Sequence, residues 1–194
     1  MIEIPQPSIA LNSHDVPGTT YEMWETWKVP ANVSADWLPA MVSILSVGAE
    51  NDIKCLIINC HGLYEKGVNS SGKQRLIMTG GFGLSIGQGI YPTDAHHFSQ
   101  IKGLVKCIII TACGAAHVTN TGGTIDGNGA HLCAEMARAS GAYVIAPTIM
   151  QAPAHYKLPK NHIDNFEGLV VRFNPSGALD AKKLLGRKLI SEIV

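Results

Sequence analysis

The sequence has few charged side chains and no excess of either sign. Lys and Arg together number 15, Asp and Glu also number 15, and these residues make up 15% of the chain, below the typical fraction of about 25%. Without a basic surplus, the composition predicts no binding to nucleic acid or to anionic lipid. No apolar run approaches the roughly 20 residues that a membrane-spanning helix needs, so we expect no membrane span.

Other absences bear on the compartment of the cell. The amino terminus lacks the basic and apolar regions of a cleaved secretion signal. The five cysteines are an odd number, and three of them lie on or beside apparent core strands, which favours reduced thiols over a disulfide framework. We therefore expect a cytoplasmic location, and export by a route without a cleaved signal remains open.

The sequence also lacks the motifs of common cofactor and metal sites. The glycine-rich stretch at residues 81–87 does not have GxGxxG spacing, and no helix is predicted directly behind it, so no nucleotide cofactor is expected. Histidines are clustered near one aspartate but match no zinc-ligand spacing. We predict no metal site at these residues: Asp94, His96, His97, His117 and His131.

Two matched stretches stand out, at residues 55–62 and 107–114. Each is a short, isoleucine-rich run that ends in a reactive side chain followed by glycine, His61-Gly62 in the first and Cys113-Gly114 in the second. Such runs indicate strands buried on both faces. Because parallel sheets place ligands at the C-terminal edge of their strands, we expect neighbouring parallel strands that end at His61 and Cys113. A thiol beside an imidazole supplies a nucleophile and a proton carrier.

The rest of the chain predicts one α/β domain with an extension. Residues 1–33 contain four prolines and are expected to be an irregular N-terminal arm anchored by Trp24 and Trp27, followed by a domain over residues 34–194. We expect helices at about 34–47, 94–103, 129–140 and 179–193, strands at about 143–147 and 168–173, and a β-hairpin over 75–90. This order predicts an α/β fold, a three-layer α/β/α sandwich with a mainly parallel central sheet.

The order of the two motifs resembles the catalytic pattern of the caspase–hemoglobinase fold, the clan CD cysteine peptidases. Its parts here are Ile-Ile-Asn-Cys-His-Gly at 57–62 and Ile-Ile-Thr-Ala-Cys-Gly at 109–114, and residues 129–145 resemble the family's next helix–strand unit. The similarity covers roughly residues 53–150 and is greatest to bacterial caspase-like branches, namely self-processing toxin protease domains and caspase-like domains paired with helical repeats. The Gln-Ala-Cys-Arg/Gln-Gly sequence of caspases proper is absent, so a specificity for aspartate is not implied.

The resemblance implies a cysteine peptidase that cleaves a protein or peptide substrate through an acyl-enzyme. Cys113 would attack the scissile carbonyl, and His61 would protonate the leaving amine. Gly62 and Cys113 match the positions whose backbone N–H groups form the family's oxyanion hole, and no third triad member is required. Further residues are candidates for the substrate groove: Gly114, His117 and Asp126. The loops at 63–75 and 117–129 are expected to border this groove.

Several alternatives remain open at the level of sequence. A non-peptidase thiol acyl transferase or amidase could use the same dyad, and a catalytically silent caspase-like domain could bind a protein partner through the N-terminal arm. His117 is the rival imidazole, although His61 is the one fixed at a strand end. The other cysteines are expected to be buried, small hydrophobes: Cys55, Cys60, Cys107 and Cys133. The preferred substrate residue is undetermined, with three acidic candidates for its pocket: Asp94, Asp126 and Asp164.

Overall fold

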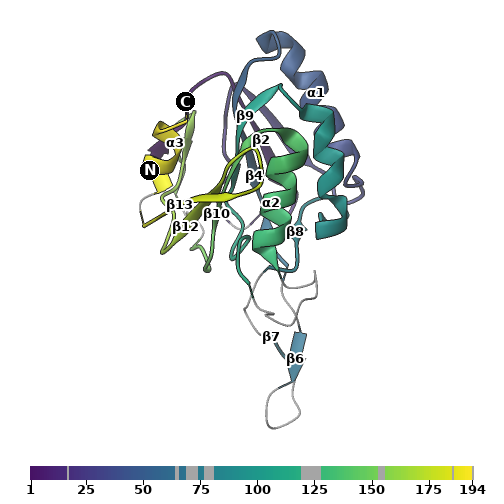
Figure 1. Ribbon diagram of the computed structural model, residues 1–194, viewed down its shortest axis with the longest axis vertical. Coiled ribbons are helices and arrows are strands. Elements are labelled where there is room, and N and C mark those ends of the chain that lie inside the picture. Colours follow the sequence, from purple (N-terminus) through teal and green to yellow (C-terminus); the bar gives the residue numbers. More distant parts are fainter. Residues whose placement is uncertain are drawn as a thin grey trace.

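A sheet of seven strands runs through the middle of the described chain (Figure 1). The structure is a computed structural model, and it describes residues 1–16, 18–63, 66–68, 74–76, 81–118, 128–152, 156–184 and 186–193. The strand order in the sheet is β13-β12-β10-β9-β4-β2-β3. The protein is therefore mixed α/β, which confirms the predicted class.

Five of these strands are parallel and two are antiparallel to their neighbours. The parallel strands are β2 (Ser8–Ser13), β3 (Glu25–Val29), β4 (Ile53–Asn59), β9 (Val105–Ile110) and β10 (Tyr143–Pro147). The antiparallel strands are β12 (Val170–Phe173) and β13 (Leu179–Lys183). The parallel strands occupy consecutive positions, so their C-terminal ends share one edge of the sheet.

Strands β4 and β9 are direct neighbours in parallel, as the sequence predicts. Ile57 lies opposite Ile109, and Ile58 lies opposite Ile110. The first pair belongs to the hydrophobic core on one face of the sheet, and the second pair belongs to the core on the other face. Burial on both faces explains why these runs are continuously apolar instead of alternating with polar residues.

The two faces of the sheet have different covers (Figure 1). On one face pack α1 (Trp37–Ser46), α2 (Gly129–Ser140) and the 3-10 helix η2 (Pro92–Ile101), and a short 3-10 turn η1 (Val47–Ala49) follows α1. On the other face pack α3 (Gly186–Ser191) and a small sheet of β1 (Ile2–Glu3) with β11 (His162–Ile163). Both termini lie beside α3.

Helix α2 begins and ends where its sequence predicts. The Asn128 side chain accepts a hydrogen bond of 3.0 Å from the backbone N–H of His131, as an N-cap residue does. Gly141 ends the helix with φ of +67°, a left-handed conformation that glycine adopts without steric cost. Its apolar side rests on the sheet through buried residues such as Leu132 and Met136.

The expected irregular arm is wrong, because residues 8–13 and 25–29 form strands β2 and β3 of the central sheet. The prolines flank these strands instead of interrupting them, so all backbone N–H groups needed for pairing remain available. Strand β2 is buried along its whole length between β4 and β3. Trp24 and Trp27 are half-buried and pack against the main core, in keeping with their expected anchoring role.

Two other predicted elements differ in the structure. The expected hairpin over 75–90 is wrong: β7 (Gln74–Leu76) pairs with β6 (Lys66–Val68), and β8 (Leu84–Ser85) pairs with β5 (His61–Gly62). The expected helix over 179–193 is also wrong in its first part, because residues 179–183 form the edge strand β13. At the first of these places the pairing of β8 with the more distant β5 overrode the local preference, and at the second the antiparallel pairing of β13 with the preceding β12 did so.

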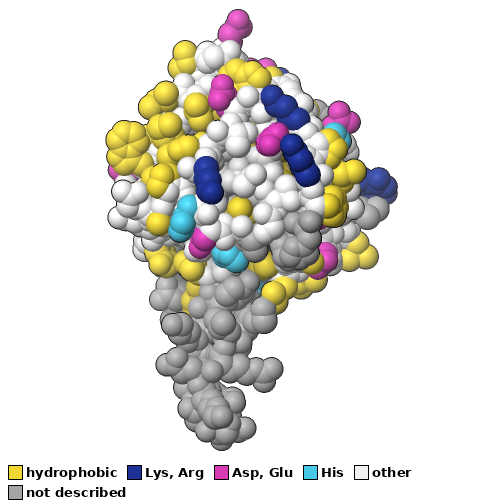
Figure 2. Space-filling model, turned by 180° about the vertical axis from the view of Figure 1, so that it is seen from behind, with side chains coloured by type: hydrophobic (Ala, Val, Ile, Leu, Met, Phe, Trp, Pro, Cys, Tyr) yellow, Lys and Arg dark blue, Asp and Glu magenta, His cyan; other side chains and the backbone are white. Residues whose placement is uncertain are grey.

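Exposed apolar side chains gather on the outer side of α1. Trp37, Ile44 and Val47 are each more than half exposed, at 54%, 60% and 68%. Figure 2 shows hydrophobic side chains concentrated on this side of the molecule. None of the described helices is both long enough and apolar enough to cross a membrane.

Phe98 on η2 provides a test of the helical layer, because it is only 1% exposed and belongs to the core beneath α1 and α2. We expect Phe98→Ala to lower the free energy of unfolding by about 3–5 kcal/mol, since it removes a large buried side chain and leaves a cavity. Phe98→Leu should cost less than about 2 kcal/mol. Urea denaturation followed by circular dichroism would measure both, and equal losses would contradict this packing.

Candidate active site

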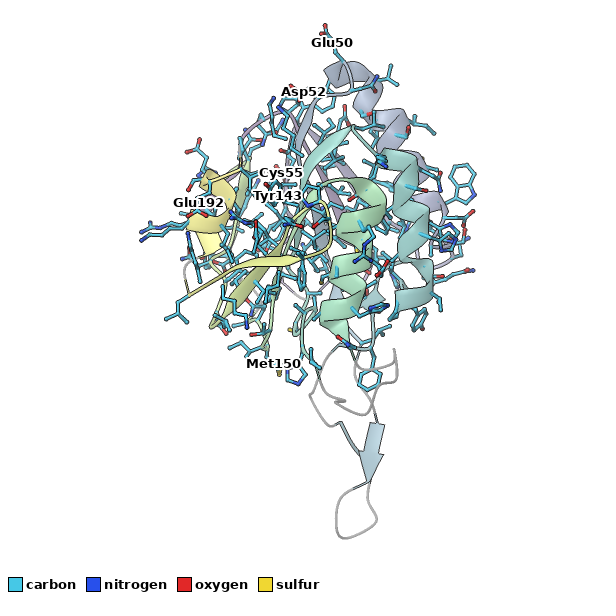
Figure 3. All side chains as sticks on the ribbon, viewed as in Figure 1. Glu50, Asp52, Cys55, Tyr143, Met150 and Glu192 are labelled. Atoms are coloured by element: carbon cyan, nitrogen blue, oxygen red, sulfur yellow. The ribbon has the colours of Figure 1, made fainter. Side chains whose placement is uncertain are left out.

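His61 and Cys113 line one pocket at the C-terminal edge of the parallel strands. In Figure 3, Met150 marks this edge, while Glu50 and Asp52 mark the opposite one. The pocket holds about 520 Å³ of empty space, its open mouth included. The residues that line it come from the segments after β2, β4, β9 and β10 and before β12: Val16, Thr19, Tyr21, Asn59, Cys60, His61, Thr111, Cys113, Gln151, Ala152, Asp164, Asn165 and Phe166.

Cys113 is half-buried in the turn that follows β9. Its sulfur accepts a hydrogen bond of 3.2 Å from the Gln151 N–H and donates one of 3.3 Å to the Gln151 carbonyl. The next residue, Gly114, has φ of +55°, and its N–H donates to the Ile149 carbonyl at 2.8 Å. The segment after β10 therefore holds the cysteine turn in place, and the Gly114 N–H is committed to this contact.

His61 lies in β5 with its Nε2 atom 3.1 Å from the backbone carbonyl oxygen of Asp15. A carbonyl only accepts hydrogen bonds, so this contact requires a proton on Nε2. In the neutral imidazole, Nδ1 is then the basic nitrogen. The segment after β2 thus fixes both the ring orientation and the tautomer of His61. The Asp15 carbonyl is an orienting partner that sequence reasoning did not find.

The side chain of Asp15 adds a negative charge beside this imidazole. Partial burial would raise the pKa of Asp15, but a hydrogen bond from the Ser13 hydroxyl and the nearby imidazoles of His14 and His61 outweigh it and lower that pKa. The carboxylate of Asp15 is therefore ionised at neutral pH.

Gly62 brings the histidine segment into backbone contact with the cysteine segment. A Cβ atom at Gly62 would lie 2.0 Å from the carbonyl oxygen of Cys113 and 3.6 Å from its backbone nitrogen. Only glycine permits an approach this close. The Gly62 and Cys113 backbones, both expected to contribute to an oxyanion hole, are accordingly neighbours.

A buried polar network forms part of the pocket. Asn59 donates to Asn12 Oδ1 at 2.8 Å, and Asn12 makes two hydrogen bonds with the Tyr21 backbone, at 2.9 and 3.0 Å. The Thr111 hydroxyl donates to Asn59 Oδ1 at 3.2 Å. These bonds satisfy side chains that are nearly inaccessible to water, which fixes the spacing of β2, β4 and β9 at this edge.

Tyr21 and Asp164 give the pocket its electrostatic character. Burial raises the pKa of Tyr21 to about 12. A hydrogen bond with the Asp164 backbone lowers this pKa, and the charge of Asp164 raises it further. The phenol is therefore neutral at physiological pH. Asp164 accepts hydrogen bonds from the Tyr156 hydroxyl at 3.0 Å and from the Asn165 N–H at 2.8 Å.

The remaining predicted site residues are placed as follows. His117 is not among the residues that line this pocket. Its Nδ1 atom instead lies 3.1 Å from the Thr148 carbonyl oxygen. Gly114 lies buried beside the pocket. Asp126 and most of the loops at 63–75 and 117–129 lie outside the described residues. Within the described ranges, no group of three or more His, Cys, Asp or Glu side chains could hold a metal ion.

One signal in the sequence could have identified two of the missed residues. Asn59 precedes His61 by two positions, and Thr111 precedes Cys113 by two. Side chains two positions apart on an extended chain point to the same side. A polar residue two positions before His61 or Cys113 is therefore expected to point toward the same pocket as that residue. No comparable signal marks Asp15, Tyr21 or Gln151.

The pocket can support covalent chemistry at sulfur. It places a partly accessible thiol and an imidazole with one free basic nitrogen at the same sheet edge. Such a pair provides a nucleophile and a group that moves protons. In comparisons with known proteins, no protein-family model matches the chain, and no curated protein matches its sequence.

Gly62→Ala should destabilise the protein by about 3 kcal/mol, because the new methyl group would collide with the Cys113 backbone. Gly103→Ala is the matched control, since its Cβ would meet nothing within 4 Å and the left-handed backbone alone should cost about 1 kcal/mol. Thermal and urea unfolding would compare the two. A Gly62 variant as stable as the Gly103 variant would refute the close approach.

Cys113 should be the only cysteine that reacts in the folded protein, because the other four are buried. Burial raises the pKa of Cys133 to about 12 and also raises that of Cys60. A hydrogen bond with Cys55, together with burial, raises the pKa of Cys107. Iodoacetamide at neutral pH should therefore add one group, as judged by intact mass spectrometry. The Cys113→Ala variant should remain unlabelled, and a second adduct would count against the packing.

Proposed function

We propose that this protein is a cysteine peptidase of the caspase–hemoglobinase type, with Cys113 as nucleophile and His61 as proton carrier. One observation supports it above the others: two adjacent parallel strands end at one pocket that contains both side chains. This is the arrangement that the resemblance of the two motifs implies. The three-layer, caspase-like form of the fold belongs to the same proposal, and helices on both faces of the sheet support it.

In the first half of the reaction, the Cys113 thiol gives its proton to Nδ1 of His61, and the sulfur attacks the carbonyl carbon of the scissile peptide bond. The new C–S bond pushes the carbonyl electrons onto oxygen, and the tetrahedral intermediate collapses with breakage of the C–N bond. His61 gives its Nδ1 proton to the leaving amine. A free amine departs, and the other half of the substrate stays on Cys113 as a thioester.

The second half releases the acid. Nδ1 of the now neutral His61 removes a proton from a water molecule, whose oxygen attacks the thioester carbon. The C–S bond breaks, a carboxylic acid leaves, and the proton on His61 returns to the Cys113 sulfur, which restores the starting state of the dyad. The Asp15 carbonyl holds Nε2–H throughout, so Nδ1 is the nitrogen that moves the proton in both halves.

The negative charge on oxygen in both intermediates needs hydrogen-bond donors. We assign this role to the backbone N–H groups of Gly62 and Cys113, whose segments are in direct contact. A single donor of this kind typically contributes about 100–1,000-fold in rate. The Gly114 N–H is not assigned to this role because it already donates to the Ile149 carbonyl.

The experiment is a peptide-library digest with the wild-type protein and single-site variants. Cys113→Ala and His61→Ala should each lower turnover by at least about 1,000-fold and leave circular dichroism and the unfolding midpoint almost unchanged. Cys60→Ala is the matched control, since this neighbouring thiol is buried, and it should retain activity.

Labelling with a peptide acyloxymethyl ketone, read by mass spectrometry, separates the function classes. Labelling at Cys113 with peptide cleavage supports a peptidase. Labelling without cleavage in any library would identify a thiol transferase or amidase instead. No labelling of the folded protein would point to a catalytically silent domain.

A further inference from the structure

We propose that the pocket beside Cys113 accepts a cationic side chain, arginine or lysine, and that Asp164 recognises its charge. The position of this side chain, immediately before the scissile bond, rests on the proposed peptidase function. The preference of the pocket for a cation rests on its own residues. The wall that carries Asp164 comes from the segment between β11 and β12, far from Cys113 in the sequence.

Apart from the His61 imidazole, the described lining of the pocket carries charge of one sign. Asp164 is the one carboxylate among its lining residues, and no Lys or Arg is among them. Within the part of the chain that the structure describes, Asp164 forms no ion pair. A carboxylate in a partly enclosed space without a basic partner favours a ligand that brings the positive charge.

The hydrogen bonds of Asp164 orient its carboxylate without neutralising it. The Tyr156 hydroxyl and the Asn165 N–H both donate to Oδ1. These donors are neutral, and no described residue donates to Oδ2, which is therefore open to a further donor. A guanidinium or an ammonium group supplies such donors together with a full positive charge.

The rest of the lining suits the long stem of a basic side chain. Val16, Tyr21 and Phe166 provide apolar surface, and the methylene groups of arginine and lysine pack well on such surface. Phe166 is held by a close approach to the first residue of α3, because a Cβ atom at Gly186 would lie 2.3 Å from its ring. Tyr21 is neutral at physiological pH, so its phenol adds no second negative charge.

The same features disfavour other substrate residues. An aspartate or glutamate would place a second carboxylate beside Asp164, and the described lining holds no Lys or Arg to balance it. A leucine would leave the Asp164 carboxylate facing an apolar group and would remove this carboxylate from water without a positively charged partner. Both penalties act on binding, so they can be measured without catalysis.

The first experiment measures binding to the Cys113→Ala protein by NMR titration. The probes are Nα-acetyl-arginine methylamide and the citrulline analogue, which has nearly the same shape but no charge. The arginine amide should bind at least about tenfold more tightly. Asp164→Asn should abolish this difference. Asp36→Asn is the matched control, because Asp36 is a fully exposed carboxylate at the start of α1, and it should preserve the preference.

The second experiment compares aminocoumarin peptides that differ only in having Arg, Lys, Leu or Asp before the scissile bond. With the intact dyad, kcat/KM should be highest for Arg and Lys, and Asp164→Asn should lower it for Arg on the order of 100-fold. The value for Leu should change by less than about threefold.

The outcomes separate this inference from the peptidase proposal. Equal binding of the two amides, or a preference that survives in Asp164→Asn, overturns the inference whether or not peptides are cleaved. Cleavage that requires Cys113 but favours Leu or Asp overturns it while leaving the peptidase intact. Binding of the arginine amide that requires Asp164, without any peptide cleavage, supports the cation pocket and counts against the peptidase.

Discussion

Parallel pairing of β4 with β9 is the constraint on which the candidate site depends. The register Ile57–Ile109 and Ile58–Ile110 places the two strand ends side by side, and both faces of each strand are buried. A slip of one residue would turn every side chain to the opposite face. The buried cores on both faces therefore fix which side chains reach the edge, and His61 and Cys113 lie just beyond it.

The strands bring the dyad to one edge, but neighbouring segments set its geometry. The Asp15 carbonyl fixes the His61 ring, and the Gln151 backbone contacts the Cys113 sulfur. Gly62 lets the segments that carry His61 and Cys113 touch through their backbones. The site is thus assembled from segments that follow β2, β4, β9 and β10, and each of these strands is largely buried.

The sequence by itself determined the features that depend on local pattern. Continuous apolar runs identified β4 and β9, and the residue types that follow them identified His61 and Cys113. A cap at Asn128 and a glycine at 141 set the limits of α2. These features were predictable because burial, capping and left-handed backbone each place demands on residues close together in the sequence.

Only the tertiary structure decided which distant segments pair and which residues surround the dyad. Residues 8–13 became an inner strand because β4, far along the chain, pairs with them, and residues 179–183 became an edge strand by pairing with the preceding β12. Propensity and proline content do not record such pairing. The contact of Asp15 with His61 and the pocket walls at Tyr21 and Asp164 depend on segments that long-range pairing brings together. Their role depends on spatial neighbours, so no pattern of adjacent residues could reveal it.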